Sequence, residues 1–180
     1  MRLLTTITAA SVLVSLLASC QSNSSSKDQD PTPTAAQGYL KVNFDGQTKV
    51  YSDARISVGQ MGSIKSLTIT AGSTSKDYLT ISVFGSTPGN YPYRTDLNIY
   101  EQVSQVEYQI HDTKFNNYKA LLCPTTSDYY STTGQVQLTE YVAGKRAKGT
   151  FSGELLDQNA EDECSKAGKS FSGEFSVVAP

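Results

Sequence analysis

The sequence predicts an all-β fold, either a single antiparallel β-sandwich or a flattened β-barrel, with about nine or ten strands. Short runs of residues alternate between apolar and polar, which is the pattern of strands with one buried face. No run shows the 3.6-residue apolar period of an amphipathic helix. Turn-forming residues separate the runs, and the chain of 180 residues contains 13 Gly and 11 Tyr but no Trp. This length suits one domain with one sizeable core.

The expected strands begin after residue 37. Asp45-Gly46 offers a tight turn between the first two, because glycine adopts positive φ at little cost. Thr87–Asn90 and Lys145–Lys148 are further predicted turns. The polar segment Leu156–Ala167 is expected to be a loop or one or two helical turns. The runs that predict strands lie at 40–44, 49–51, 56–58, 66–71, 78–84, 105–111, 118–122, 134–141, 149–156 and 171–177, of which 118–122 is a short apolar run.

The tetrapeptide Phe-Ser-Gly-Glu occurs twice, at 151–154 and at 171–174. Both copies lie in alternating runs, so they predict two neighbouring strands of similar pattern. In each copy the Phe and the Gly share one face, where a ring from the adjacent strand can lie over bare glycine backbone. The alternative is a functional carboxylate pair, Glu154 and Glu174, on the opposite face.

The N-terminal segment has the features of a bacterial export signal. Arg2 precedes an uncharged apolar run at 3–17, which is too short for a permanent membrane span but fits a secretory signal. The segment ends in Leu17-Ala18-Ser19-Cys20, which resembles the lipobox of bacterial lipoproteins. The resemblance implies that residues 1–19 are removed and that Cys20 becomes the acylated N-terminus. The alternative is an ordinary cleavable signal with an incidental cysteine.

Residues 20–37 are predicted to form the lipidated cysteine and a disordered tether, followed by one domain over 38–180. Residues 21–37 include no Val, Ile, Leu or aromatic residue, so they cannot bury enough apolar surface to offset their ordering entropy. Gln21 stands where inner-membrane retention signals have Asp, so the lipobox resemblance implies delivery to the outer membrane. The face of that membrane stays open, because the charged run at 27–30 resembles a surface-export tag but also fits a solvated linker.

Three motifs within the predicted domain form a recognisable series. They are a Pro-Gly-x-Tyr turn, a Thr-x-x-Gly-x-Val-x-Leu-Thr strand and a Gly-Thr-Phe-Ser-Gly strand, made by Pro88, Gly89, Tyr91, Thr132, Gly134, Val136, Leu138, Thr139 and Gly149 to Gly153. Together with the Asp-Gly hairpin, the series resembles a family of small β-rich lipoprotein domains from Bacteroidota. The resemblance covers most of residues 38–180. It implies a lipid-anchored β-domain and supplies neither catalytic residues nor a ligand.

Cys123 and Cys164 remain once Cys20 is assigned to the lipid anchor. Two thiols in an envelope compartment usually pair, so a disulfide between Cys123 and Cys164 is predicted. In the chain-entropy model, closing a loop of about 40 residues stabilises a fold by roughly 4 kcal/mol. The alternative is a reduced Cys123 that acts as a nucleophile with His111.

Charge and composition argue against several classes of function. The chain has 15 Lys+Arg and 17 Asp+Glu, a net charge of −2, whereas a nucleic-acid binder would show a clustered basic excess. The single histidine, His111, leaves few routes to hydrolytic dyads or His-rich metal sites. It is expected at the surface or at a strand end, since His111 and Asp112 would face opposite sides of a strand. No catalytic residue, metal or cofactor is predicted.

Tyrosine is the enriched residue type that fits binding, because it combines a flat apolar ring with a polar tip. Tyr91 and Tyr93 flank Pro92, and Tyr129 and Tyr130 are adjacent, so these four form a possible binding surface. We therefore expect a non-enzymatic, membrane-anchored domain that binds an envelope protein or a glycan, or that serves as an envelope structural component. The alternative is a calycin-like barrel that holds a small apolar ligand in its interior.

Overall fold

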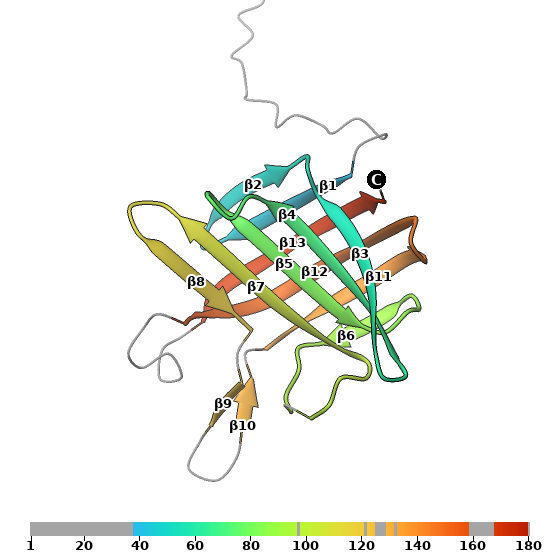
Figure 1. The fold of residues 1–180 in the computed structure, drawn as a ribbon. Coiled ribbons are helices and arrows are strands. Elements are labelled where there is room, and N and C mark those ends of the chain that lie inside the picture. The colour runs from blue at the N-terminus through green and yellow to red at the C-terminus, as the bar shows by residue number, and fades with distance from the viewer. Residues whose placement is uncertain are drawn as a thin grey trace, which may run out of the picture. The chain divides into compact units, whose positions relative to one another are not determined.

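Thirteen β-strands make up the regular structure of the described residues in this computed structural model (Figure 1). The described residues are 38–96, 98–120, 122–124, 129–131, 133–158 and 168–179. The strands are β1 (Tyr39–Phe44), β2 (Gln47–Tyr51), β3 (Arg55–Met61), β4 (Ile64–Gly72), β5 (Tyr78–Phe84), β6 (Gly89–Pro92), β7 (Val103–His111), β8 (Phe115–Lys119), β9 (Leu122–Pro124), β10 (Tyr129–Ser131), β11 (Gly134–Val142), β12 (Arg146–Asp157) and β13 (Lys169–Val178). The predicted all-β class is confirmed.

The strands form one curled antiparallel sheet that folds over on itself. Its 11 strands include the path β2-β1-β13-β12-β8-β7-β5-β4-β3, with β11 beside β12 and β6 beside β11. A separate pair is formed by β9 and β10. The curl places β3, β4, β5, β7 and β8 in one layer, and the strands from β2 through β12 to β6 in the other (Figure 1). This half-barrel is consistent with the predicted sandwich or flattened barrel.

The long strand β12 belongs to both layers and joins them. From Arg146 to Leu155 it pairs with β13, whereas Leu156 and Asp157 pair with β8. Leu155 and Leu156 are both buried, at 0% and 2% exposure, although neighbours on a flat strand face opposite sides. A strand that bends from one layer into the next can present successive residues to the core. The loop predicted after Leu156 lies mostly at 159–167, outside the described residues.

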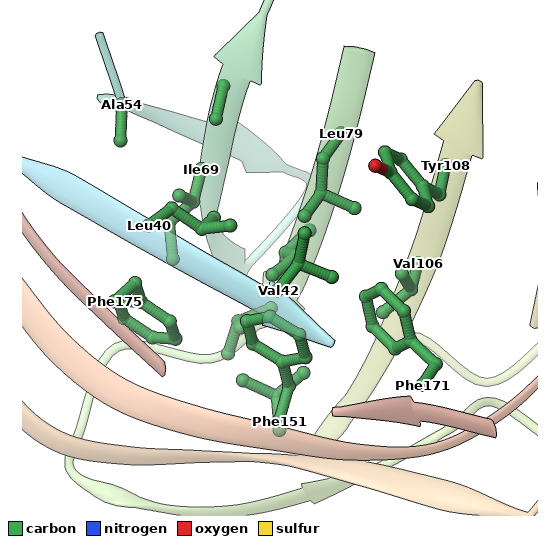
Figure 2. Close-up of a cluster of buried hydrophobic side chains, with 14 of the residues drawn as sticks. Leu40, Val42, Ala54, Ile69, Leu79, Val106, Tyr108, Phe151, Phe171 and Phe175 are labelled. Atoms are coloured by element: carbon green, nitrogen blue, oxygen red, sulfur yellow. The ribbon is translucent and has the colours of Figure 1, made fainter. Parts of the chain in front are cut away.

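Apolar side chains of the two layers fill the space between them. Figure 2 shows side chains that both layers contribute to this core: Leu40, Val42, Phe151, Phe171 and Phe175 come from one layer, and Ile69, Leu79, Val106 and Tyr108 from the other. Phe44, at the end of β1, bridges the layers. Its ring centroid lies 5.4 Å from that of Tyr108 and 6.4 Å from that of Phe171. Burial of these faces, at roughly 25 cal/mol per Å² of apolar surface, is the main driving force for the fold.

The two Phe-Ser-Gly-Glu segments lie side by side on β12 and β13, as predicted. The antiparallel register places Phe151 opposite Gly173 and Phe171 opposite Gly153. A Cβ atom built on Gly173 would lie 2.5 Å from Cζ of Phe151, so the ring occupies the space above this glycine. The rings of Phe151 and Phe171 stack, with centroids 4.7 Å apart. The repeat therefore serves packing.

The alternative carboxylate pair does not form. Glu154 lies opposite Ser170 in the register, and Glu174 lies opposite Thr150. Both glutamates are exposed and are separated along the two strands. They do not share the close geometry that acid–base chemistry by two carboxylates requires.

The predicted number of strands was too low. Three strands, β6, β9 and β10, contain four, three and three residues. Such short strands show no alternation that a sequence pattern could reveal. The strand β6 also overlaps the predicted turn at 87–90. It pairs with β11 in the described structure, and this edge position tolerates Pro92 because no second neighbour needs its missing N–H.

Gly173→Ala is expected to destabilise the domain by about 3 kcal/mol, because the new methyl group would overlap the carbonyl oxygen of Lys41 and the ring of Phe151. Urea unfolding monitored by far-ultraviolet circular dichroism measures this change. Gly59→Ala on β3 is the matched control. Its Cβ would meet Ser66 Oγ at 3.0 Å and no backbone atom, so stability should stay within about 0.5 kcal/mol of the parent. Equal stability of the two variants would contradict the ring-over-glycine packing.

Candidate functional site

A polar pocket of about 330 Å³ lies where the β1–β2 hairpin approaches the start of β5 and the end of β7. This volume falls at the lower end of the range for small-molecule sites. The pocket takes side chains from both layers of the sheet. They are Phe44, Gln47, Lys49, Asp77, Tyr108, Ile110, His111 and Asp112. Four of them carry ionisable groups other than phenols, namely one lysine, two aspartates and the single histidine.

An ion pair between Lys49 and Asp77 joins the two layers at this pocket. Lys49 Nζ donates to Asp77 Oδ2, and Asp77 Oδ1 accepts the backbone N–H of His111 at 3.3 Å. Burial alone would lower the pKa of Lys49, but the hydrogen bond to Asp77 and the charges of Asp77 and Asp112 hold it above its ordinary value. Lys49 is therefore a charged donor near neutral pH rather than a nucleophile.

A second polar contact joins the two layers near this pocket. The hydroxyl groups of Tyr51 and Tyr108 are 2.9 Å apart, which ties β2 to β7. Burial raises the pKa of both tyrosines, and the mutual hydrogen bond raises the pKa of Tyr51 further. Both phenols are therefore neutral near pH 7, so neither is suited to act as a general base.

His111 is the last residue of β7 and is exposed, as the sequence predicted. Its ring packs edge-on against Phe115, with centroids 4.8 Å apart. Asp112 follows in an exposed turn and also lines the pocket. Within the described ranges, no three or more His, Cys, Asp or Glu residues are grouped so that they could hold a metal ion. The pocket thus brings one ammonium group, two carboxylates and one imidazole together.

The sequence did not identify Lys49, Asp77 or Tyr108 as site residues. Lys49 and Asp77 are 28 positions apart, and Tyr51 and Tyr108 are 57 positions apart. Only the pairing of strands brings them together, and no motif of fixed spacing marks them. Their signal in the sequence is limited to a lysine and a tyrosine within alternating runs.

Two tyrosines of the expected binding surface are buried, so this part of the prediction is wrong. Tyr91 is 0% exposed and Tyr93 is 2% exposed. Tyr91 and Tyr93 lie on the inner side of β6 and just beyond it, with exposed Pro92 between them, so both rings enter the core. The Tyr91 hydroxyl donates to the Thr87 carbonyl oxygen at 2.5 Å.

The remaining predicted site residues lie outside what the structure describes. Cys20 and Cys164 fall in ranges that are not described, and the same holds for the side chains of Cys123, Tyr129 and Tyr130. The disulfide, the lipidation site and the second tyrosine pair therefore stay predictions.

Four aromatic rings pack together between the layers, the region in which a calycin-like barrel would hold its ligand. Phe44 lies 4.7 Å from Tyr118 by ring centroids, in addition to its contacts with Tyr108 and Phe171. All four rings are buried. The calycin-like alternative stays a prediction.

Comparisons with known proteins find no relative of this chain. No protein-family model matches it, and no curated protein or solved structure matches it either. Over the ranges that the structure describes, there is also no helix with the length and apolar character of a membrane span. A functional interpretation therefore depends on the sequence motifs and on the geometry of the pocket.

Tyr93→Phe is expected to stabilise the domain by about 1 kcal/mol, because the buried Tyr93 hydroxyl has no hydrogen-bond partner in the described structure. Tyr91→Phe is the matched control. It should destabilise by about 1 kcal/mol, since it removes the hydrogen bond to Thr87. Thermal unfolding of both variants measures the two opposite shifts. A loss of stability in Tyr93→Phe would mean that its hydroxyl is satisfied in solution.

Proposed function

We propose that this protein is a lipid-anchored, non-enzymatic domain of the bacterial outer membrane that binds a small polar ligand. The observation that carries the anchor is the sequence Leu17-Ala18-Ser19-Cys20 at the end of an apolar export signal. Cys20 would carry the acyl chains. Each buried methylene group contributes about 0.8 kcal/mol, so several chains hold a protein stably at a membrane without a spanning helix.

The polar pocket supports the binding role. It places the Lys49 ammonium among the carboxylates of Asp77 and Asp112, so these three side chains sum to one negative charge. Such a pocket favours a ligand with hydroxyl groups and a cationic group over an acidic one. The protonation states of Lys49 and Tyr108 support binding rather than acid–base catalysis. A small amino sugar has this chemistry and a suitable size.

Cys20→Ala is expected to abolish incorporation of radiolabelled palmitate and to release the protein from the membrane fraction, because the acylated sulfur is lost. Immunoblotting of membrane and soluble fractions measures the release. Ser19→Ala is the control, since it retains the thiol and should keep the label. Unchanged labelling of Cys20→Ala would refute the lipid anchor.

Glucosamine is expected to bind the full-length protein more tightly than glucuronate, as measured by saturation-transfer NMR. Asp112→Asn should weaken glucosamine binding about tenfold by removing one charge-assisted contact. The exposed Glu101→Gln variant lies outside this pocket and should bind like the parent. Equal binding by all three proteins would exclude this pocket as the site.

A further inference from the structure

The domain receives its N-terminal chain at one identifiable end. Gly38 lies beside the last residues of β13, because a Cβ atom built on it would be 3.1 Å from Val177 Cα and 3.3 Å from Val178 N. In the register, Val178 pairs with Arg146 of β12, and Arg146 pairs with Val142 of β11. Figure 1 shows the start of β1 and the end of β13, near the C mark, at this same end of the domain. The turn between β11 and β12 therefore lies next to the point where the tether enters.

The outer face at this end carries a patch that is both apolar and basic. We define the anchor-side patch as Val142, Lys145, Arg146 and Val178. Val142 is 36% exposed and Val178 is 41% exposed, and they flank Arg146 in one row across three strands. Lys145 is exposed in the adjoining turn. Apolar side chains next to basic ones are suited to the interface between lipid headgroups and acyl chains.

The charge around this patch is positive. Glu140 forms ion pairs with Arg146 and with Lys148, so two cationic side chains share one carboxylate. Lys145 adds a further positive charge. The neighbouring segment contributes an exposed Asp53 and an exposed Arg55, whose charges cancel. The chain as a whole has a net charge of −2, so the positive charge at this end is opposite in sign to the net charge of the chain.

We infer that the anchor-side patch docks on an anionic phospholipid surface, an inference that rests on the proposed lipid anchor at Cys20. The predicted tether at 21–37 separates Cys20 from Gly38, and a disordered chain of this length would have a root-mean-square span of roughly 25 Å. The tether therefore keeps the patch at a high effective concentration near the bilayer. Basic residues held near anionic headgroups are attracted over about a Debye length.

Tryptophan fluorescence tests this docking, because the chain contains no Trp of its own. The mature lipidated protein is reconstituted into vesicles of phosphatidylethanolamine and phosphatidylglycerol with brominated acyl chains. Val178→Trp reports on the patch, and Met61→Trp reports on the exposed far end of β3. Quenching is expected to be severalfold stronger for Val178→Trp. Adding Lys145→Glu and Arg146→Glu to the Val178→Trp protein should reduce its quenching to the level of Met61→Trp. Adding Lys65→Glu and Lys114→Glu instead should leave the stronger quenching of Val178→Trp unchanged.

Two results would contradict docking of the anchor-side patch on the membrane. Equal quenching at the two positions would mean that the tethered domain does not rest on the membrane through this patch. A concentration-dependent blue shift of Val178→Trp in the full-length Cys20→Ala chain without vesicles would assign the patch to a second copy. Palmitate incorporation is measured on the same preparations, so failure of the anchor is distinguished from failure of the docking.

Discussion

The packing of aromatic rings over glycine backbone is the contact on which the curled sheet depends. Phe151 lies over Gly173, and Phe175 lies over Gly149, at 2.5 Å and 2.6 Å from the Cβ positions that these glycines lack. Both contacts run between β12 and β13. Glycines without side chains allow a sheet to bend strongly, and rings from the adjacent strand fill the space that remains. The bend lets β12 pass from one layer to the other, and this passage closes the core.

Much of the architecture was predictable from local pattern. The alternating runs correctly predicted which residues of β1, β4, β5 and β7 point into the core. The repeated tetrapeptide correctly predicted that β12 and β13 are neighbouring strands. The sequence pattern did not predict burial correctly where a side chain is buried by residues from other parts of the chain. Tyr91 and Tyr93 beside a proline suggested an exposed surface, yet both are buried. The Tyr91 ring lies against Gly85, and the Tyr93 ring lies against Gly134 and Gly153. The pocket could not be predicted, because Lys49 and Asp77 meet only through strand pairing.

The strand β1 relates the two proposed contacts of the protein. Its first residue, Tyr39, follows the tether entry at Gly38, and its last residue, Phe44, lines the polar pocket. Six residues of extended strand span about 20 Å. A domain that docks by its anchor-side patch therefore holds its pocket away from the bilayer, where a water-soluble ligand can reach it.

The pairing of β1 with β13 also constrains when the protein can fold. Residues such as Leu40 and Phe175 are partners in the register although most of the domain's sequence separates them. Contacts of such long sequence separation form late, because a large loop must close first. If the chain is exported as proposed, the sheet on the far side of the membrane is completed only after β13 has crossed. The topology therefore delays completion of the sheet until the C-terminal strand of the domain is available.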